Sequence, residues 1–162
     1  MRWRDPLVLA ASMLTLASVA VAQDVSAGEQ IWIDKAGCPQ CHGWAGDGFA
    51  SGFHEQGAPS LRKTQLDRDQ IRLTIQCGRP GTRMPHFDRF AYTDKRCYGM
   101  TAQELGNREP DRATTTLQPY EIDAVAEYVA AKVKGAGPVT RAQCYNVFGR
   151  QAEAECARYP ER

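Results

Sequence analysis

Two features are missing from most of this 162-residue chain: a long apolar run and an excess of charge of one sign. After residue 22 no stretch is apolar over the roughly 20 residues that a membrane span needs. Without residues 1–22 the formal net charge falls from +1 to zero, because that segment contains two arginines and one aspartate. A neutral chain offers no general attraction to nucleic acid. A β-strand pattern, an internal repeat and a low-complexity run are also missing, so we expect an all-α protein.

The segment 1–22 has the composition of an export signal. It starts with two arginines, continues with mostly small and apolar residues, and ends in Ala20-Val21-Ala22, which fits the site that signal peptidase cuts. We therefore expect cleavage near Ala22 and export of a soluble chain that begins near Gln23. About 140 mature residues form one domain with a modest core.

Helix signals recur along the mature chain. Asp67 and Gln70 form the sequence pattern of a capping box, and so do Thr101 and Glu104. Glycine ends two of the predicted helices, and proline begins the longest one. The predicted helices cover residues 25–35, 67–77, 101–105 and 119–134. Residues 43–59 are rich in glycine and are predicted to form a loop.

The segment KAGCPQCHGWAGDG, residues 35–48, raises the question of what Cys38, Cys41 and His42 bind. A structural zinc site needs four ligands, commonly in two close pairs, and the chain has no second C-x-x-C. A redox-active disulfide is a further possibility, because C-P-x-C occurs in disulfide oxidoreductases. That hypothesis leaves His42 unexplained and needs alternating strands and helices. The third interpretation is covalent haem attachment, which C-x-x-C-H indicates in an exported chain.

The haem interpretation gives every residue of the motif a chemical purpose. Two thiols three positions apart can add to the two vinyl groups of one haem, and His42 then lies beneath the iron as the fifth ligand. Met84, in GRPGTRMPHF (residues 78–87), is the candidate sixth ligand, because Pro85 stiffens the turn that presents its thioether. A methionine opposite a histidine raises the reduction potential. The alternatives are that Met84 fills a gap in the core, or that His54 or His86 displaces it. We expect both histidines to be ordinary polar residues at a loop surface.

Four cysteines remain, and they allow three disulfide pairings. We favour Cys77–Cys97, which would clip the loop that carries Met84, and Cys144–Cys156, which would close the C-terminal segment. In the rarer alternative, Cys77 or Cys97 binds iron as a thiolate.

Over about residues 24–135 the chain resembles the single-haem class I cytochromes c of bacterial periplasms. The matching features are Gly28, Trp32, CPQCH, GAPSL (57–61), GTRMP (81–85) and LQPYEIDAVAEYV (117–129). The resemblance implies a cytochrome c fold with three to five helices wrapped around one covalent haem c. It also implies that Gly28 meets the helix face containing Tyr128 and Val129, and that the Pro59 carbonyl faces the free nitrogen of His42.

The chain departs from this family in one spacing between motif residues and in two added segments. Trp32 is further from Cys38 than usual. The cytochrome domain, residues 23–136, carries an insertion at about 87–116. A C-terminal tail, residues 137–162, is extra, and we expect it to be stapled by a disulfide with at most one further helical turn after Thr140.

The expected function is single-electron transfer in the periplasm between a donor, such as a quinoprotein dehydrogenase, and an acceptor, such as an oxidase. No nucleophile–base constellation is present, so no catalysis is expected. One alternative is a haem protein with an open or labile sixth site that reacts with peroxide or binds a gas. Another is a permanently bound electron-accepting subunit of a dehydrogenase complex. Residues 62–96 contain nine Lys or Arg against four Asp or Glu, which would favour a partner with an acidic docking surface.

Overall fold

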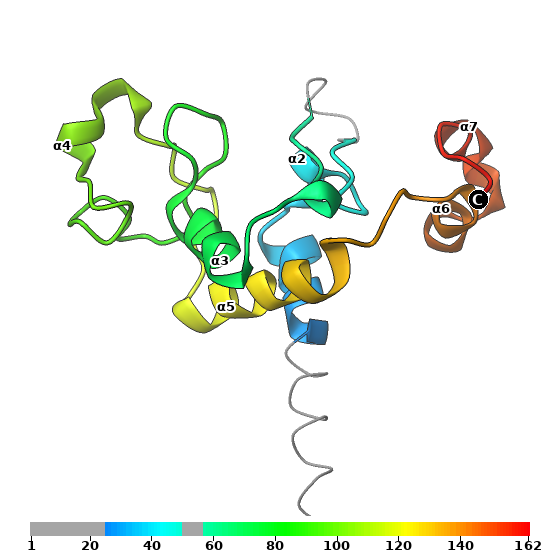
Figure 1. Cartoon of the computed structure of the whole chain (residues 1–162), viewed down its shortest axis with the longest axis horizontal. Helices are drawn as coiled ribbons and strands as arrows, with labels where there is room; N and C mark the ends of the chain where they lie inside the picture. Colours follow the sequence, from blue (N-terminus) through cyan, green and yellow to red (C-terminus); the bar gives the residue numbers. More distant parts are fainter. Residues whose placement is uncertain (1–24, 50–56) are drawn as a thin grey trace, which may run out of the picture.

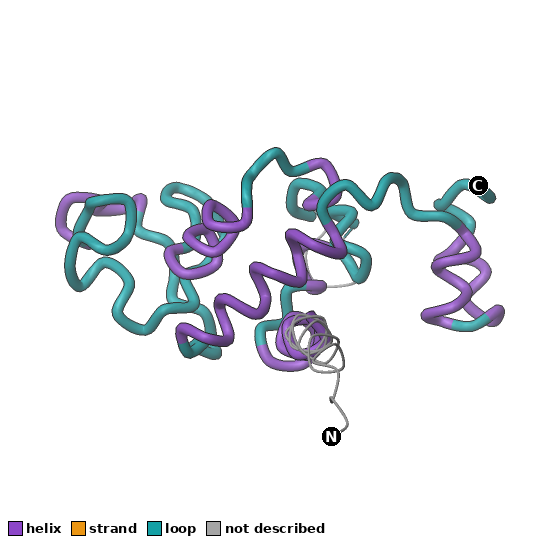
Figure 2. Tube along the Cα trace, turned by 60° about the horizontal axis from the view of Figure 1, so that its bottom comes forward, coloured by secondary structure: helices purple, strands orange, loops and turns teal. Residues whose placement is uncertain are grey.

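The structure is a computed structural model, and it describes residues 25–49 and 57–162. The export signal and His54 lie outside these residues. The described residues form helices and loops without a β-strand; two isolated bridges join His86 to Arg112 and Cys97 to Met100. The all-α prediction is confirmed (Figures 1 and 2).

The four predicted helices are present. Residues 25–30 are helical and continue into the next element without a break. The elements in chain order are η2 (Ile31–Lys35), α2 (Pro39–His42), η3 (Leu61–Lys63), α3 (Arg68–Cys77), α4 (Ala102–Leu105), η4 (Gly106–Arg108), α5 (Pro119–Tyr128), η5 (Val129–Val133), α6 (Arg141–Phe148), η6 (Arg150–Ala152) and α7 (Glu153–Cys156). Of these, η2 and η5 are π-helical, and η5 prolongs α5 into the long helix expected up to about residue 134.

Capping explains where α3 begins and ends. The Asp67 carboxylate accepts a hydrogen bond from the Gln70 amide at 2.8 Å, and the Gln70 side chain accepts one from the Asp67 amide at 2.9 Å. These bonds satisfy N–H groups that have no partner within the helix. Gly78 ends α3 with φ +64°, a conformation that glycine adopts at low cost. Thr101 and Glu104 form the same box at α4.

A central cluster of buried side chains lies where α3, α5 and the first helix meet (Figure 1). Its members are Trp32, Ile71, Ile75, Phe87, Leu117, Ile122, Val125, Ala126, Val129 and Val133. Gly28 makes the helix crossing possible: a Cβ there would collide with the Ala124 carbonyl oxygen and lie 2.9 Å from Tyr128 Cβ. The expected meeting of Gly28 with the Tyr128 face is therefore confirmed.

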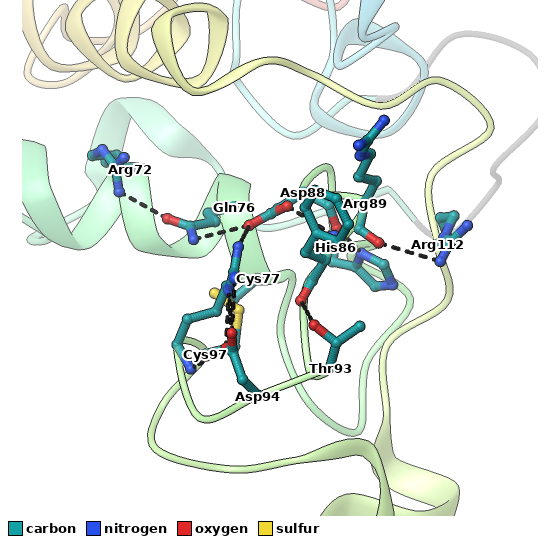
Figure 3. Close-up of polar contacts among 12 residues, drawn as sticks. Arg72, Gln76, Cys77, His86, Asp88, Arg89, Thr93, Asp94, Cys97 and Arg112 are labelled. Carbon is teal, nitrogen blue, oxygen red and sulfur yellow. Dashed lines mark hydrogen bonds and ion pairs between the residues drawn. A yellow bond between two sulfur atoms is a disulfide. The ribbon is translucent and has the colours of Figure 1, made fainter.

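The insertion forms a second cluster, which we call the insertion cluster. Its buried members are Cys77, Ala91, Tyr92, Cys97 and Leu105. A hydrogen bond from Gln76 of α3 to Asp88 of the insertion, at 3.2 Å, ties the two together, and Arg72 of the same helix donates to Gln76 at 2.8 Å (Figure 3). The disulfide between Cys77 and Cys97 joins α3 to the insertion covalently. This is one of the two pairings favoured from the sequence.

The tail contains more helix than expected. The eight-residue α6 is followed by η6 and α7, so the expectation of at most one further turn after Thr140 was wrong. Thr140 and Gln143 form a capping box that starts α6, and a disulfide joins Cys144 of α6 to Cys156 of α7. This second pairing was also the favoured one. Cross-linking stabilises a short helix that would be marginal alone.

None of the helices among residues 25–49 and 57–162 has the length and apolar character needed to cross a membrane.

Candidate functional site

The CPQCH motif forms the short helix α2, with Pro39 in its first turn. The His42 amide donates to the Cys38 carbonyl at 2.9 Å, and the Cys38 amide donates to the Trp32 carbonyl at 3.1 Å. Both thiols of the motif are free, whereas the other four cysteines are paired. Burial raises the pKa of Cys38 to about 12. A redox-active cysteine has a lowered pKa instead, so this environment argues against the disulfide-exchange interpretation.

The His42 ring is mostly buried beside Trp32, with 6.0 Å between the ring centroids. Burial lowers the pKa of His42, and a hydrogen-bonding contribution from the Pro59 backbone opposes that effect. The neutral imidazole is the form that binds a metal ion. Nδ1 of His42 is buried and, among the described residues, has no hydrogen bond of good geometry. The Pro59 backbone lies close enough to His42 to affect its pKa. The role of the Pro59 carbonyl as the acceptor for His42 Nδ1 stays a prediction.

Main-chain hydrogen bonds bring the segment around Pro59 to α2. The Ala58 amide donates to the Cys41 carbonyl at 3.0 Å, and the Gly48 amide donates to the His42 carbonyl at 2.8 Å. A Cβ at Gly48 would collide with the Ala58 carbonyl, so only glycine permits this approach. The glycine-rich loop thus folds back on the motif that precedes it.

Met84 lies partly buried against the central cluster, which Cys38 also contacts and which contains Trp32. Its own loop holds the backbone in place: the Arg79 amide donates to the Met84 carbonyl at 3.1 Å, and the Met84 amide donates to Thr82 Oγ1 at 3.2 Å. The structure therefore brings Cys38 and Met84 to one cluster. They come from segments more than forty positions apart in the sequence.

The insertion clamps the Met84 loop. The Gly81 amide donates to the Arg108 carbonyl at 2.8 Å, and the His86 amide donates to the Asp111 carbonyl at 3.0 Å. These bonds lie on both sides of Met84. Sequence patterns did not indicate this clamp, because residues 106–113 carry no signal that names their partner.

His86 is buried, with 4% of its surface exposed. Its Nδ1 lies 2.8 Å from the Asp88 carbonyl oxygen (Figure 3), and its ring meets the Tyr92 ring edge to face. The expectation that His86 is an ordinary polar residue at a loop surface was wrong. Main-chain hydrogen bonds with Asp111 and Ala113 hold His86 against that part of the insertion.

Cys77 and Cys97 are fully buried and bonded to each other, with an S–S distance of 2.05 Å. Neither sulfur is available as a thiolate. This finding contradicts the alternative in which one of them binds iron.

The positive charge of residues 62–96 is partly balanced inside the protein. Arg68 and Arg72 both pair with Asp123 of α5, at 2.9 Å and 2.8 Å, and Arg96 pairs with Asp94 at 2.7 Å. Arg62 is used differently, since its guanidinium donates to three main-chain carbonyls, those of Ala45, Ala136 and Gly137.

The tail contacts the segment that follows His42. Trp44 Nε1 donates to Tyr159 Oη at 3.1 Å, and the Trp44 ring meets Phe148 edge to face at 5.6 Å. We call Val139, Cys144, Cys156 and Tyr159 the tail cluster; it packs against Trp44 and Ala45. Sequence reasoning missed this contact. The only signal for it was that the tail contains aromatic residues, among them Phe148 and Tyr159, to which no partner was assigned.

The residues present fit a covalently attached haem. Two free thiols and an imidazole lie on α2, and a thioether borders the same cluster as Cys38. Trp32 Nε1 and His42 Nδ1 are buried polar atoms that lack a hydrogen-bond partner in the described part of the chain. Buried polar atoms of that kind call for an explanation, and a bound group such as haem supplies one. Across the described ranges, no group of three His, Cys, Asp or Glu could hold a metal ion by itself.

The family model for cytochrome C oxidase, cbb3-type, subunit III, matches residues 23–102. The chain carries a c-type cytochrome domain. This match contains CPQCH, the Met84 loop and about half of the insertion, and it ends before α5. No curated protein sequence matches the cytochrome.

Two solved structures are similar to this cytochrome at low identity. A chain of the Kuenenia stuttgartiensis reducing HAO-like protein complex Kustc0457/Kustc0458 is 19% identical, with 69% of this chain and 44% of that chain covered and a TM-score of 0.46. The c-type cytochrome SorU from Sinorhizobium meliloti is 17% identical, with 70% and 94% covered and a TM-score of 0.42. The cytochrome thus spans less than half the length of the Kuenenia chain.

Proposed function

We propose that this protein is a periplasmic electron carrier with one haem c, attached through Cys38 and Cys41 and bound by His42 and Met84. One observation carries the proposal: the pairing of the other four cysteines leaves only the CPQCH thiols free, beside a buried histidine nitrogen that has no partner in the described part of the chain. Haem c, when bound, supplies a one-electron couple whose potential depends on the axial ligands and on burial. The residues supply attachment, orientation and exclusion of water.

Each site residue has a defined task in this proposal. Cys38 and Cys41 provide the two sulfurs for attachment, and the hydrogen bond from His42 to the Cys38 carbonyl keeps the histidine on the same turn. The Pro59 carbonyl would accept from His42 Nδ1 and fix the ring, as partners of metal-bound histidines generally do. Trp32, 2% exposed, excludes water beside the ring.

The proposed partners are redox proteins of the periplasm, with a quinoprotein dehydrogenase as a possible donor and an oxidase as a possible acceptor. The basic residues 62–96 still favour an acidic docking surface on a partner, although ion pairs balance part of their charge. Association with such a partner should weaken as salt is added, because exposed charges are screened.

A second candidate is a permanently docked subunit of a dehydrogenase complex. It is favoured by apolar side chains at the surface of the tail and beside Trp44: Phe49 is 58% exposed, Val147 57% and Phe148 43%. Size measurement of the natively isolated protein separates the candidates. A free carrier elutes alone, whereas a docked subunit elutes with a large partner and stays with it at high salt.

Absorption spectra of the exported protein, oxidised and reduced, test the ligand pair. We expect a covalent haem spectrum with the weak methionine-to-iron band at the red end. Met84→Ala should remove the band, and Met100→Ala is the matched control, because Met100 is also partly buried but packs in the insertion cluster. Cys38→Ala with Cys41→Ala should abolish covalent attachment. A band that survives in Met84→Ala would contradict the proposed sixth ligand.

A further inference from the structure

The insertion contains two tyrosines with an unusual backbone. Tyr92 has φ +60° and Tyr98 has φ +55°, and no other non-glycine residue in the described part of the chain has a positive φ. This conformation costs free energy for a bulky side chain, so the surrounding contacts must favour it.

Both tyrosines use this conformation to reach adjacent carbonyls. Tyr92 Oη donates to the Cys77 carbonyl at 2.7 Å, and Tyr98 Oη donates to the Gly78 carbonyl at 2.9 Å. Burial raises the pKa of Tyr92 to about 12, so its hydroxyl remains a donor at neutral pH. The two hydroxyls therefore act as a pair on two successive peptide units, those on either side of the Gly78 Cα.

These two peptide units lie at the end of α3, where carbonyls lack partners within the helix. Four successive carbonyls there accept hydrogen bonds from the insertion. The donors are the amides of Phe87 and Asp88, to Ile75 and Gln76, and the hydroxyls of Tyr92 and Tyr98, to Cys77 and Gly78. The insertion thus caps α3 completely at these positions.

Gly78 connects the cap to Met84. A Cβ at Gly78 would lie 2.6 Å from the Met84 carbonyl oxygen and 2.9 Å from the His86 amide nitrogen, so the two backbones touch. The next residue, Arg79, donates its amide to the same Met84 carbonyl at 3.1 Å. Any movement of the Gly78 peptide is therefore passed to the Met84 backbone.

We infer that Tyr92 and Tyr98 are positioning residues for Met84: their hydroxyls fix the two peptides that flank Gly78, against which the Met84 backbone rests, and so keep the thioether in place as an axial ligand. The inference rests on the proposed ligation of haem iron by Met84. The disulfide fixes the Cys77 side chain, whereas the two hydroxyls fix the orientation of the two peptides.

The test uses the haem-loaded full-length protein with Tyr92→Phe, Tyr98→Phe and both together. Added imidazole binds iron only when Met84 leaves, so its apparent affinity reports the fraction of protein with the loop open. Loss of one hydroxyl hydrogen bond should tighten imidazole binding about fivefold. The double variant should bind it more tightly than either single one and should show a weaker methionine-to-iron band.

Tyr159→Phe is the matched control, because it also removes a hydroxyl contact, the one to Trp44, but in the tail cluster. It should leave the imidazole affinity and the band unchanged. A double variant that behaves like this control would overturn the inference.

Hydrogen exchange of the Arg79 amide separates this inference from the proposed function. If the wild-type protein has no methionine band, ligation by Met84 fails. Faster exchange at Arg79 in the double variant would then still support positioning of the loop by the tyrosines. Unchanged exchange would reject the inference as well. If the wild-type protein shows a normal methionine band, the double variant decides the inference. Unchanged exchange at Arg79 together with unchanged imidazole binding would then reject the role of the tyrosines and leave ligation by Met84 intact.

Discussion

Lys35 Nζ lies 2.6 Å and 2.7 Å from the two carboxylate oxygens of Glu121, across 86 positions of sequence. The pair joins η2, three residues before Cys38, to the first turn of α5. The Glu121 side chain is only 9% exposed and also accepts from the Gln118 amide at 2.8 Å. Burial by itself would raise the pKa of Glu121, but the bonds from Lys35 and Gln118 outweigh it and lower the pKa below the ordinary value of 4.5.

Lys35→Met should destabilise the protein in a pH-dependent way. Because the folded pKa of Glu121 is depressed, its stabilisation is present above about pH 4.5 and is lost as the pH falls through the folded pKa. Without Lys35 the buried carboxylate is uncompensated, and we expect a loss of about 2 kcal/mol at pH 7, between the values for exposed and buried pairs. Urea unfolding at pH 7 and pH 4 measures it, with a smaller loss expected at pH 4.

The control for this pair is Arg158→Gln, which removes an exposed ion pair with Glu155. It should change the free energy of unfolding by less than about 0.5 kcal/mol. An equal loss at both pH values for Lys35→Met would show that the effect of the lysine does not depend on the ionisation of Glu121.

Gly28→Ala should weaken the crossing of the helix that contains Gly28 with α5. The added Cβ would collide with the Ala124 carbonyl oxygen, which is backbone and cannot move aside alone. We expect a loss of about 1–3 kcal/mol, the usual range for overpacking, although alanine favours an isolated helix over glycine. Thermal unfolding measures the loss. Ser26→Ala, on the same helix but exposed, is the control and should be nearly neutral; a neutral Gly28→Ala would disprove the close contact.

Removal of the two disulfides should have similar effects on stability and different effects on the site. For separations of 20 and 12 residues, chain entropy predicts losses of about 3 kcal/mol each. Cys77→Ala with Cys97→Ala should also weaken the methionine-to-iron band, since this disulfide joins α3 to the insertion that clamps the Met84 loop. Cys144→Ala with Cys156→Ala should leave the band intact. Both spectra are recorded below the unfolding temperatures of the two variants. An equal band in the two variants would contradict a role of the first disulfide in holding the Met84 loop.

Truncation after Pro138 should leave haem attachment intact. The central cluster contains no tail residue, and the Arg62 contacts with Ala136 and Gly137 remain. Trp44 loses Tyr159 as acceptor, so its indole N–H should exchange faster in NMR spectra, whereas the indole of Trp32 should be unaffected. Failure of the truncated chain to incorporate haem would mean that residues 23–136 do not fold as a unit.

Local signals in the sequence determined the helices and the attachment motif. Asp67 with Gln70, Thr101 with Glu104, and Gly78 act on neighbouring residues, so their effect can be predicted without the fold. The four-residue spacing from Cys38 to His42 also lies within one turn of helix. Four cysteines can form two disulfides in three ways. The way favoured from the sequence, Cys77–Cys97 with Cys144–Cys156, is the one that the structure contains.

The segments that surround Met84 and His42 could not be predicted, because they are distant in sequence and meet only in the folded protein. The clamp from residues 106–113, the burial of His86 and the contact of Trp44 with Tyr159 depend on main-chain hydrogen bonds and ring contacts between segments far apart in sequence. Such contacts leave no periodic pattern, because the donors and acceptors are backbone groups that every residue carries. The chemistry available to this protein can thus be predicted from its amino acids, whereas the packing of the insertion and the tail sets how that chemistry is held.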